Sequence, residues 1–351
     1  MKITIIVFLL IMSTLVVADF APLIFPENSP LNFFSEFETM YISVYTFTSE
    51  DIGGLLKEEN VILMVEKSPV GGIPDRELLC SLDVDVYLYD GEKRFMHAKY
   101  AVKDNSSFFV STENFGGFDN RGWGAVVNDK NGTDKLLETF FVDLKDSIKL
   151  DCEEIDKREL RKVDATQDLE FVSGNVIVFT DNHLENLVGL IRESDELLIE
   201  QFYFHETWRG IESPLIKELV GKNAKVLLDG EWYNLEKNEE TINYLKGLGI
   251  NAKVENMNVK VHTKGMIMDN NKVLISSINW AENSITNNRE IGVVVEGDVS
   301  KFKEAFANDW EGKETIDIEK TLIESVRWIF TFLGVVFIAW LVAKRRNPRS
   351  L

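Results

Sequence analysis

Two short segments of the chain carry residue types that could do chemistry, and both use the same spacing. FMHAKYAVKD at 95–104 and VHTKGMIMD at 261–269 each place a lysine two residues after a histidine and an aspartate five residues after that lysine. The six residues are His97, Lys99, Asp104, His262, Lys264 and Asp269. Because the chain has only four histidines, a chance repetition is rare, and the two segments indicate a duplicated unit.

The similarity continues into the flanks of the two segments. An asparagine lies seventeen residues after each motif histidine, as Asn114 in STENF and as Asn279 in SSINW. Downstream, NRGWGAVV at 120–127 resembles NREIGVVV at 288–295. The other matching pairs are MYISVYTF (40–47) with LLIEQFYF (197–204), NVILMVE (60–66) with AKVLLDG (224–230), and ETFFVDL (138–144) with EAFANDW (304–310).

Short apolar runs alternate with helical patterns inside each unit. The runs at 40–47 and 60–66 are predicted strands, as are their counterparts in the second unit. Residues 239–248 repeat apolar side chains at helical spacing, and Gly249 ends that pattern. Alternating strands and helices indicate an α/β fold. We predict two tandem repeats related by a pseudo-twofold axis, each a mixed β-sheet flanked by helices, with the active site at the repeat interface.

Charge and hydropathy divide the chain into segments. The charged stretch DCEEIDKRELRKVDATQD at 151–168 is the natural joint between the repeats. The predicted segments are a signal peptide (1–18), the first repeat (32–157), a charged linker (158–168), the second repeat (169–317), a transmembrane helix (326–343) and a basic tail (344–351).

Both ends carry membrane signals. Residues 1–18 have one basic residue, an apolar run and a small-residue cleavage site at Val16-x-Ala18, which is typical of a secretory signal peptide. An uncleaved anchor is the alternative. Residues 328–343 carry no charge, and the KRRNPR that follows favours a cytoplasmic C-terminus by the positive-inside rule. We therefore expect a single-pass protein of the cell membrane whose catalytic domain lies outside the cytoplasm.

The chain has two cysteines, Cys80 and Cys152, both in its first half. An exported protein could pair them in a disulfide. Sequence spacing does not give the distance between them, so the pairing stays open.

The two motifs fit the chemistry of a phosphodiester. Residues two apart on a strand project from the same face, so each motif offers an imidazole beside an ammonium group. If both motifs meet in one cleft with Asn114 and Asn279, the lysines and amides neutralise the non-bridging oxygens. One imidazole then attacks phosphorus and the other protonates the leaving oxygen. The lysines make a metal unnecessary, and no Cys or His cluster completes a metal site, so we expect neither a metal nor a cofactor.

The duplicated motif resembles the signature of the phospholipase D superfamily, in which His-x-Lys-x4-Asp is followed by Gly-Ser-x-Asn. The resemblance spans roughly 35–315. It implies that His97 forms a covalent phosphohistidine and that His262 is the general acid. The catalytic set that we predict on this basis is His97, Lys99, Asp104, His262, Lys264, Asp269 and Glu290. The resemblance assigns phosphate binding to Lys99, Lys264, Asn114 and Asn279, with support from Thr112 and Ser277.

The sequence departs from the family pattern in two ways. Serine replaces both glycines, and threonine replaces one serine, at Thr112. The second departure concerns a family carboxylate that orients a histidine. Glu290 supplies it in the second repeat, but Gly122 occupies the equivalent place in the first, where Asp119 is a candidate substitute. If Glu290 supports His262, the roles of the two histidines could be reversed.

The substrate class depends on charge and location. Between the two membrane signals the chain has 32 basic and 58 acidic residues, a net charge of −26, and so acidic a surface repels polyanions. We expect a membrane-tethered phospholipase D-type phosphodiesterase that hydrolyses phospholipid head groups at the membrane surface. A nuclease acting on single strands and a cardiolipin-synthase-like phosphatidyl transferase are the alternatives, because the motif does not separate them. A non-catalytic binding module is disfavoured, because every motif residue is present in both copies.

Overall fold

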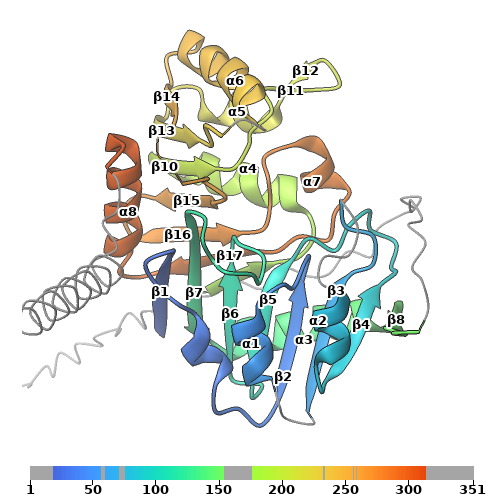
Figure 1. Ribbon diagram of the computed structural model, residues 1–351. Coiled ribbons are helices and arrows are strands. Elements are labelled where there is room, and N and C mark those ends of the chain that lie inside the picture. The colour runs from blue at the N-terminus through green and yellow to red at the C-terminus, as the bar shows by residue number, and fades with distance from the viewer. Residues whose placement is uncertain are drawn as a thin grey trace, which may run out of the picture. The chain divides into compact units, whose positions relative to one another are not determined.

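A computed structural model describes residues 19–56, 60–70, 76–153, 176–231, 234–255, 257 and 259–313. Two mixed β-sheets, of eight and seven strands, dominate this part of the chain (Figure 1). The predicted signal peptide, linker, transmembrane helix and basic tail lie outside the described residues. Inside those ranges, no helix has the length and apolar character needed to cross a bilayer.

The first repeat builds the eight-stranded sheet, in the order β1-β7-β6-β5-β2-β3-β4-β8. Strands β2, β3 and β4 are parallel, and the other neighbours are antiparallel. The strands are β1 (Asp19–Phe25), β2 (Met40–Val44), β3 (Val61–Glu66), β4 (Asp85–Tyr89), β5 (Lys99–Lys103), β6 (Ser107–Ser111), β7 (Gly122–Asn128) and β8 (Ser147–Lys149). The helices are η1 (Leu31–Phe34), α1 (Glu50–Leu55), α2 (Arg76–Ser81) and α3 (Lys130–Lys145).

The second repeat builds the seven-stranded sheet with the same topology. Its order, β9-β17-β16-β15-β10-β13-β14, reproduces that of the first sheet without the equivalent of β8, and it has the same parallel and antiparallel neighbours. The strands are β9 (Val176–Phe179), β10 (Glu196–Gln201), β13 (Asn223–Leu228), β14 (Asn251–Val254), β15 (Lys264–Met268), β16 (Lys272–Ser276) and β17 (Gly292–Glu296), with a separate hairpin of β11 (Thr207–Trp208) and β12 (Ile211–Glu212). The helices are α4 (His183–Glu193), α5 (Pro214–Leu219), α6 (Leu235–Gly247), α7 (Glu282–Thr286) and α8 (Ser300–Glu311).

The predicted α/β fold of two repeats, each a mixed sheet flanked by helices, is confirmed. A common apolar core joins side chains of both sheets, including Tyr100 and Trp123 from the first and Ile275 from the second, and it also takes in buried residues of α3 and α8. The outer face of the first sheet is covered by α1, α2 and η1, and that of the second by α4, α5 and α6. Each sheet is therefore apolar on both faces, as the near-continuous apolar runs of the central strands require.

Gly265 lets the two sheets approach each other closely. A Cβ atom at this position would lie 2.3 Å from Cε3 of Trp123, whose indole is fully buried in the common core. Since real Cβ atoms do not come so close to a ring, any side chain at position 265 would push the two repeats apart. The residue that follows the second motif lysine is thus fixed by packing across the interface.

Two boundaries differ from the sequence prediction. The first sheet begins with β1, outside the predicted limit of 32, and this strand carries Pro22 in its interior. Proline is tolerated because β1 lies at the sheet edge and pairs only with β7. The strand predicted at 40–47 ends at Val44, and its counterpart at 197–204 ends at Gln201. The residues beyond both ends leave the sheet for the candidate site.

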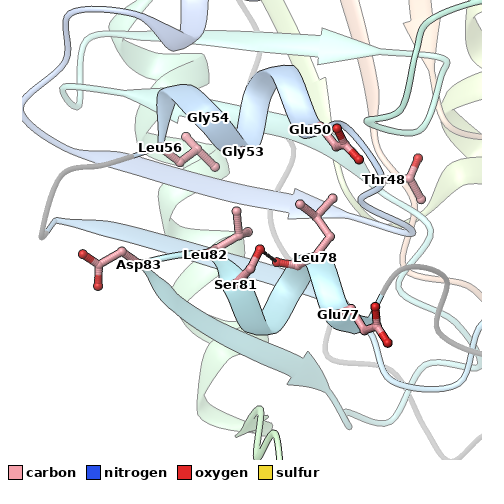
Figure 2. A pocket seen from close by; sticks show the side chains of 10 residues that line it. All are labelled: Thr48, Glu50, Gly53, Gly54, Leu56, Glu77, Leu78, Ser81, Leu82 and Asp83. Atoms are coloured by element: carbon pink, nitrogen blue, oxygen red, sulfur yellow. Dashed lines mark hydrogen bonds between the residues drawn. The ribbon is translucent and has the colours of Figure 1, made fainter.

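Helices α1 and α2 flank an open groove of about 820 Å³ on the outer side of the first repeat (Figure 2). Leu56, Leu78 and Leu82 line it together with carboxylates that include Glu50 and Glu77. The groove contains none of the residues that the sequence assigns to the site.

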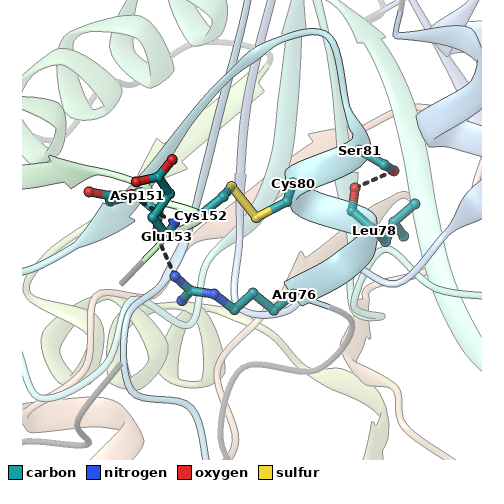
Figure 3. Close-up of a disulfide and its surroundings, with 7 residues drawn as sticks. All are labelled: Arg76, Leu78, Cys80, Ser81, Asp151, Cys152 and Glu153. Carbon is teal, nitrogen blue, oxygen red and sulfur yellow. Dashed lines mark hydrogen bonds between the residues drawn. A yellow bond between two sulfur atoms is a disulfide. The ribbon is translucent and has the colours of Figure 1, made fainter. Parts of the chain in front are cut away.

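Cys80 and Cys152 form a disulfide, which answers the question that the sequence left open. The bond joins α2 to the segment that follows β8, and the two Cα atoms lie 5.9 Å apart (Figure 3). Beside it, the Arg76 guanidinium donates to the carbonyl oxygen of Asp151. The last described residues of the first repeat are thereby fastened to its outer helix.

Candidate active site

Each motif histidine is held by the backbone of the other repeat. His97 lies in the extended segment before β5, and its amide N–H donates to the Arg289 carbonyl oxygen at 2.7 Å. Reciprocally, the His262 amide donates to the Arg121 carbonyl oxygen at 2.8 Å. Isolated β-bridges accompany both bonds, between Met96 and Arg289 and between Arg121 and Val261. The exchange is symmetric, as it is at an interface between two copies of one surface, and it brings both motifs to the repeat interface.

The two arginines that receive these bonds are buried, and ion pairs anchor both of them. Arg121 Nε lies 2.9 Å from an oxygen of Asp309 in α8, and its Nη1 lies 2.6 Å from Glu27. Arg289 Nε lies 3.0 Å from Asp143 in α3. A buried guanidinium needs such fixed partners, because an unpaired charge there would be strongly destabilising. The closing helix of each repeat therefore fixes the backbone that positions a histidine.

Both histidines are paired with a glutamate of the other repeat. His97 Nδ1 lies 2.8 Å from Glu290 Oε2, and His262 Nδ1 lies 2.8 Å from Glu113 Oε1. Glu290 therefore supports His97 and not His262, and the first-repeat carboxylate is Glu113 and not the candidate Asp119, which is exposed. Glu113 was missed because its counterpart in SSINW is Ile278, so the repeat pattern did not mark it.

The motif lysines are completely buried beside the histidines. Lys99 Nζ donates to the His97 carbonyl oxygen at 2.7 Å, and Lys264 Nζ donates to that of His262 at 2.6 Å. Burial lowers the pKa of Lys99 to about 8, against the opposing attraction of Glu290 and Glu113. Burial and the nearby charge of Lys99 lower the pKa of Lys264 well below its ordinary value. An arriving phosphodiester anion would relieve this repulsion, so the two lysines form a site for a negative group.

Both imidazoles are neutral in the free protein. Burial lowers the pKa of His97, aided by the charges of Lys99 and Lys264 and opposed by Glu290. Burial lowers the pKa of His262 to about 3, with Lys264 and Lys99 acting in the same direction and Glu113 opposing. Burial alone would raise the pKa of each glutamate, but the neighbouring histidine and lysine lower it, so both carboxylates are ionised. Nδ1–H therefore donates to glutamate in each pair, and Nε2 keeps its lone pair.

An aromatic ring packs against the imidazole of each motif histidine. The Tyr45 ring packs edge-on against His97 with 4.9 Å between centroids, and Phe202 packs in the same way against His262 at 4.7 Å. These two residues are the first beyond the ends of β2 and β10, and they occupy equivalent positions. The Tyr45 hydroxyl also accepts the Val70 amide at 2.7 Å. The residues that leave the sheet thus form matching walls.

The predicted phosphate ligands divide into two groups. The side-chain amide oxygens of Asn114 and Asn279 are buried and have no hydrogen-bond partner among the described residues, and the NH2 group of each amide is the donor that a phosphate oxygen would require. By contrast, the Thr112 hydroxyl accepts the Trp123 amide at 3.0 Å, and the Ser277 hydroxyl accepts that of Ile291 at 2.9 Å. Both hydroxyls thus hold the loop that presents the asparagines, and the supporting role in substrate binding that the resemblance assigns to Thr112 and Ser277 stays a prediction.

The motif aspartates do not belong to the cluster, and their predicted catalytic role is corrected. Asp104 has a φ of 51° and Asp269 a φ of 47°, and each begins the tight turn after its motif strand. Asp104 Oδ1 accepts the amides of Glu38 and Thr39, and Asp269 Oδ1 accepts the amides just before and at the start of β10. An extended strand of this length places them roughly 20 Å from the histidines. Aspartate suits the position because it tolerates positive φ and accepts backbone N–H groups.

The described residues contain no group of three or more His, Cys, Asp or Glu side chains placed to hold a metal ion. What the structure assembles instead is two imidazoles, each with a carboxylate, beside two ammonium groups. Such a set can supply a nucleophile, an acid and fixed positive charge to a phosphorus centre.

Comparisons with known proteins agree with this fold. The family model described as cardiolipin synthase, PLD-like domain, matches residues 187–310. Among solved structures, the fold resembles phosphatidylserine synthase of Haemophilus influenzae Rd KW20, with a TM-score of 0.56 and 10% identity over 88% of this chain and 91% of that chain. It also resembles polyphosphate kinase of Porphyromonas gingivalis, with a TM-score of 0.52 and 11% identity over 82% of this chain and 49% of that one.

A shorter match is Nuc of Salmonella typhimurium, a phospholipase D family member, with 17% identity and a TM-score of 0.34 over 38% of this chain and 98% of that chain. The search of curated proteins finds no match. The family match falls on the second repeat. The second repeat is therefore similar to a phospholipase D-like domain, and the first repeat shares its strand order and its His-x-Lys-x4-Asp motif.

Proposed function

We propose that the protein is a phospholipase D-type hydrolase that cleaves the head-group phosphodiester of a phospholipid through a phosphohistidine intermediate. The observation that carries the proposal is the buried cluster of two histidine–glutamate pairs, each beside a buried lysine. The arrangement provides two imidazoles that are each held at Nδ1 by a glutamate, so that one can attack phosphorus while the other protonates the leaving oxygen.

In the proposed first step, Nε2 of His97 attacks phosphorus and forms a P–N bond as the P–O bond to the head group breaks. Nε2 of His262 gives its proton to the leaving oxygen. Burial, aided by the charges of Lys264 and Lys99, keeps His262 neutral in the free protein. The bound phosphate anion offsets these positive charges and favours the imidazolium, so the acid form becomes accessible in the complex. In the second step His262 takes a proton from water, which attacks phosphorus and breaks the P–N bond. The products are a phosphatidate and the free head-group alcohol.

Charge favours a lipid over a nucleic acid as the substrate. The chain between its two membrane signals carries a net charge of −26, which repels a polyanion, whereas a single phosphodiester needs only the local lysine pair. We also propose that the site binds its phospholipid substrate at a membrane surface.

The test presents the full-length protein in detergent with labelled phospholipids of several head groups and with labelled single-stranded DNA, with and without EDTA. We expect head-group release from lipid and no change in turnover with EDTA, because lysines and amides stabilise the charged phosphorus centre. Activity lost in EDTA and restored by one divalent metal would refute the mechanism. Transfer of the phosphatidyl group to an added alcohol without any hydrolysis would identify a transferase instead.

A nuclease is the second candidate, and one feature favours it. Two cations lie over aromatic rings beside the histidines: Arg94 is 5.5 Å from the Phe95 ring, and Lys260 is 4.6 Å from the Phe202 ring. Such pairs can stack bases and bind a single-stranded backbone. Cleavage of the DNA arm alone would establish this function in place of the first.

We also propose that the catalytic domain is exported and tethered to the membrane by residues 326–343. The small-residue site at Val16-x-Ala18 and the basic tail from Lys344 support this orientation. Protease added to intact cells should digest the domain and leave a C-terminal epitope tag protected until the cells are permeabilised. A domain that survives protease on intact cells would refute the orientation.

A further inference from the structure

The two carboxylates that hold the histidines come from positions that are not equivalent in the two repeats. Glu290 lies in NRE, just before β17, whereas Glu113 lies in STEN, just after β6. The residue equivalent to Glu290 is Gly122, and the residue equivalent to Glu113 is Ile278. Each repeat therefore supplies one carboxylate, but at exchanged positions.

The absence of a side chain at Gly122 is linked to the presence of a glutamate at position 113. A Cβ atom built on Gly122 would lie 2.6 Å from Cγ of Glu113 and 3.0 Å from its Oε1. The Glu113 side chain thus occupies the volume that a side chain at 122 would need. The φ of Gly122 is not in the positive range, so the position needs glycine for space and not for its backbone.

Both carboxylates nevertheless end in the same surroundings. The second oxygen of Glu113 accepts the Asn120 amide at 2.9 Å, and the second oxygen of Glu290 accepts the Asn288 amide at 3.0 Å. Asn120 and Asn288 are equivalent residues. Each glutamate is buried, with one oxygen on a histidine and the other on this asparagine, although the two backbones start from different places.

We propose that Glu113 is the positioning residue for His262, and that the Glu113–Gly122 pair is an exchanged form of the Ile278–Glu290 pair. The inference rests on the proposed phosphodiesterase function. Glu113 holds the His262 ring with its proton on Nδ1, which leaves Nε2 toward the phosphorus centre. The Glu290 side chain contacts His97 of the other repeat, and position 122 is equivalent to position 290. A glutamate at position 122 should therefore be able to contact His262 when Glu113 is replaced by alanine.

Imidazole NMR tests the positioning role without any need for activity. The full-length protein labelled with ¹⁵N-histidine has four imidazoles, which substitution assigns. In the wild type, His97 and His262 should each show a protonated Nδ1 and an unprotonated Nε2. In Glu113→Gln only His262 should lose this fixed tautomer, and in Glu290→Gln only His97 should. An unchanged His262 signal in Glu113→Gln would overturn the proposal.

Kinetics then separate positioning from mere structural support. Glu113, Lys264 and Lys99 are the charged groups that face His262, and loss of the Glu113 charge lowers the pKa of this histidine. If His262 is the acid, Glu113→Gln moves the alkaline limb of kcat, which reports the enzyme–substrate complex, to lower pH. Glu290→Gln is the matched control. His97 faces Glu290, Lys99 and Lys264, so this variant moves the acidic limb to lower pH instead. Both variants should lose at least about 10²-fold in kcat.

The exchange itself is tested by Glu113→Ala combined with Gly122→Glu. We expect the double variant to recover at least about tenfold of the activity that Glu113→Ala loses, and to regain the Nδ1-protonated signal of His262. Gly122→Glu alone should be impaired, because both side chains then compete for one volume. A folded double variant that recovers neither signal nor activity would overturn the exchange. A wild type that cleaves no phosphodiester would sink the proposed function, while the NMR result would still decide the role of Glu113.

Discussion

Alanine in place of either His97 or His262 is expected to reduce kcat for an alkyl phosphodiester by at least about 10⁴-fold while leaving the fold intact. Each ring is held by the other repeat through its backbone amide and its Nδ1 atom, so both serve one site. The first substitution removes the nucleophile, and the second removes the proton that an alkoxide leaving group needs. Because the two residues act as a unit, the double variant should be hardly slower than either single variant.

Turnover of a labelled phospholipid measures the loss, and circular dichroism with thermal unfolding reports on the fold. His205→Ala is the matched control, because its ring packs on Tyr203 and makes no contact with either glutamate pair. We expect this variant to retain activity within a few-fold of the wild type. Substantial activity in His97→Ala or in His262→Ala would rule out a shared site.

The duplicated motif was sufficient to predict the architecture. Strands that alternate with helices in two matching units predict two similar sheets. The charge of Lys99 acts on Lys264, as the predicted pseudo-twofold pairing of the motifs implies. The sequence predicts that the two repeats meet at the site, but it does not predict which backbone groups of one repeat contact the other. That His97 rests on the backbone of Arg289, and His262 on that of Arg121, depends on long-range pairing that sequence spacing does not encode.

The errors have physical causes. Asp104 belongs to the motif, but its five-residue strand carries it away from the histidine, and its side chain holds a turn rather than a substrate. Glu113 is not marked by the repeat pattern, because the equivalent residue in the second repeat is Ile278. Glu113 facing Ile278 and Gly122 facing Glu290 are two departures that compensate each other only in space. The sequence signal for Glu113 is the combination of both differences, a glutamate gained at position 113 and a glutamate lost at position 122.

The second large effect concerns which histidine carries the phosphoryl group. With bis(p-nitrophenyl) phosphate the leaving p-nitrophenolate needs no proton, so His262→Ala should still complete the first step. It should then stall, because no base activates the water that breaks the P–N bond. We expect a burst of about one equivalent of p-nitrophenolate per protein, with the phosphoryl group mapped to His97 in an alkaline quench, where phosphohistidine survives. His97→Ala should give no burst and no adduct.

The positions of the carboxylates do not decide which histidine is the nucleophile. Both imidazole rings have a glutamate on Nδ1, so carboxylate support does not distinguish His97 from His262. Glu290 supports His97, which is the nucleophile according to the family resemblance. An adduct on His262 that accumulates in His97→Ala would reverse the assignment. It would also reverse the pH signatures, because Glu113→Gln would then move the acidic limb and Glu290→Gln the alkaline one.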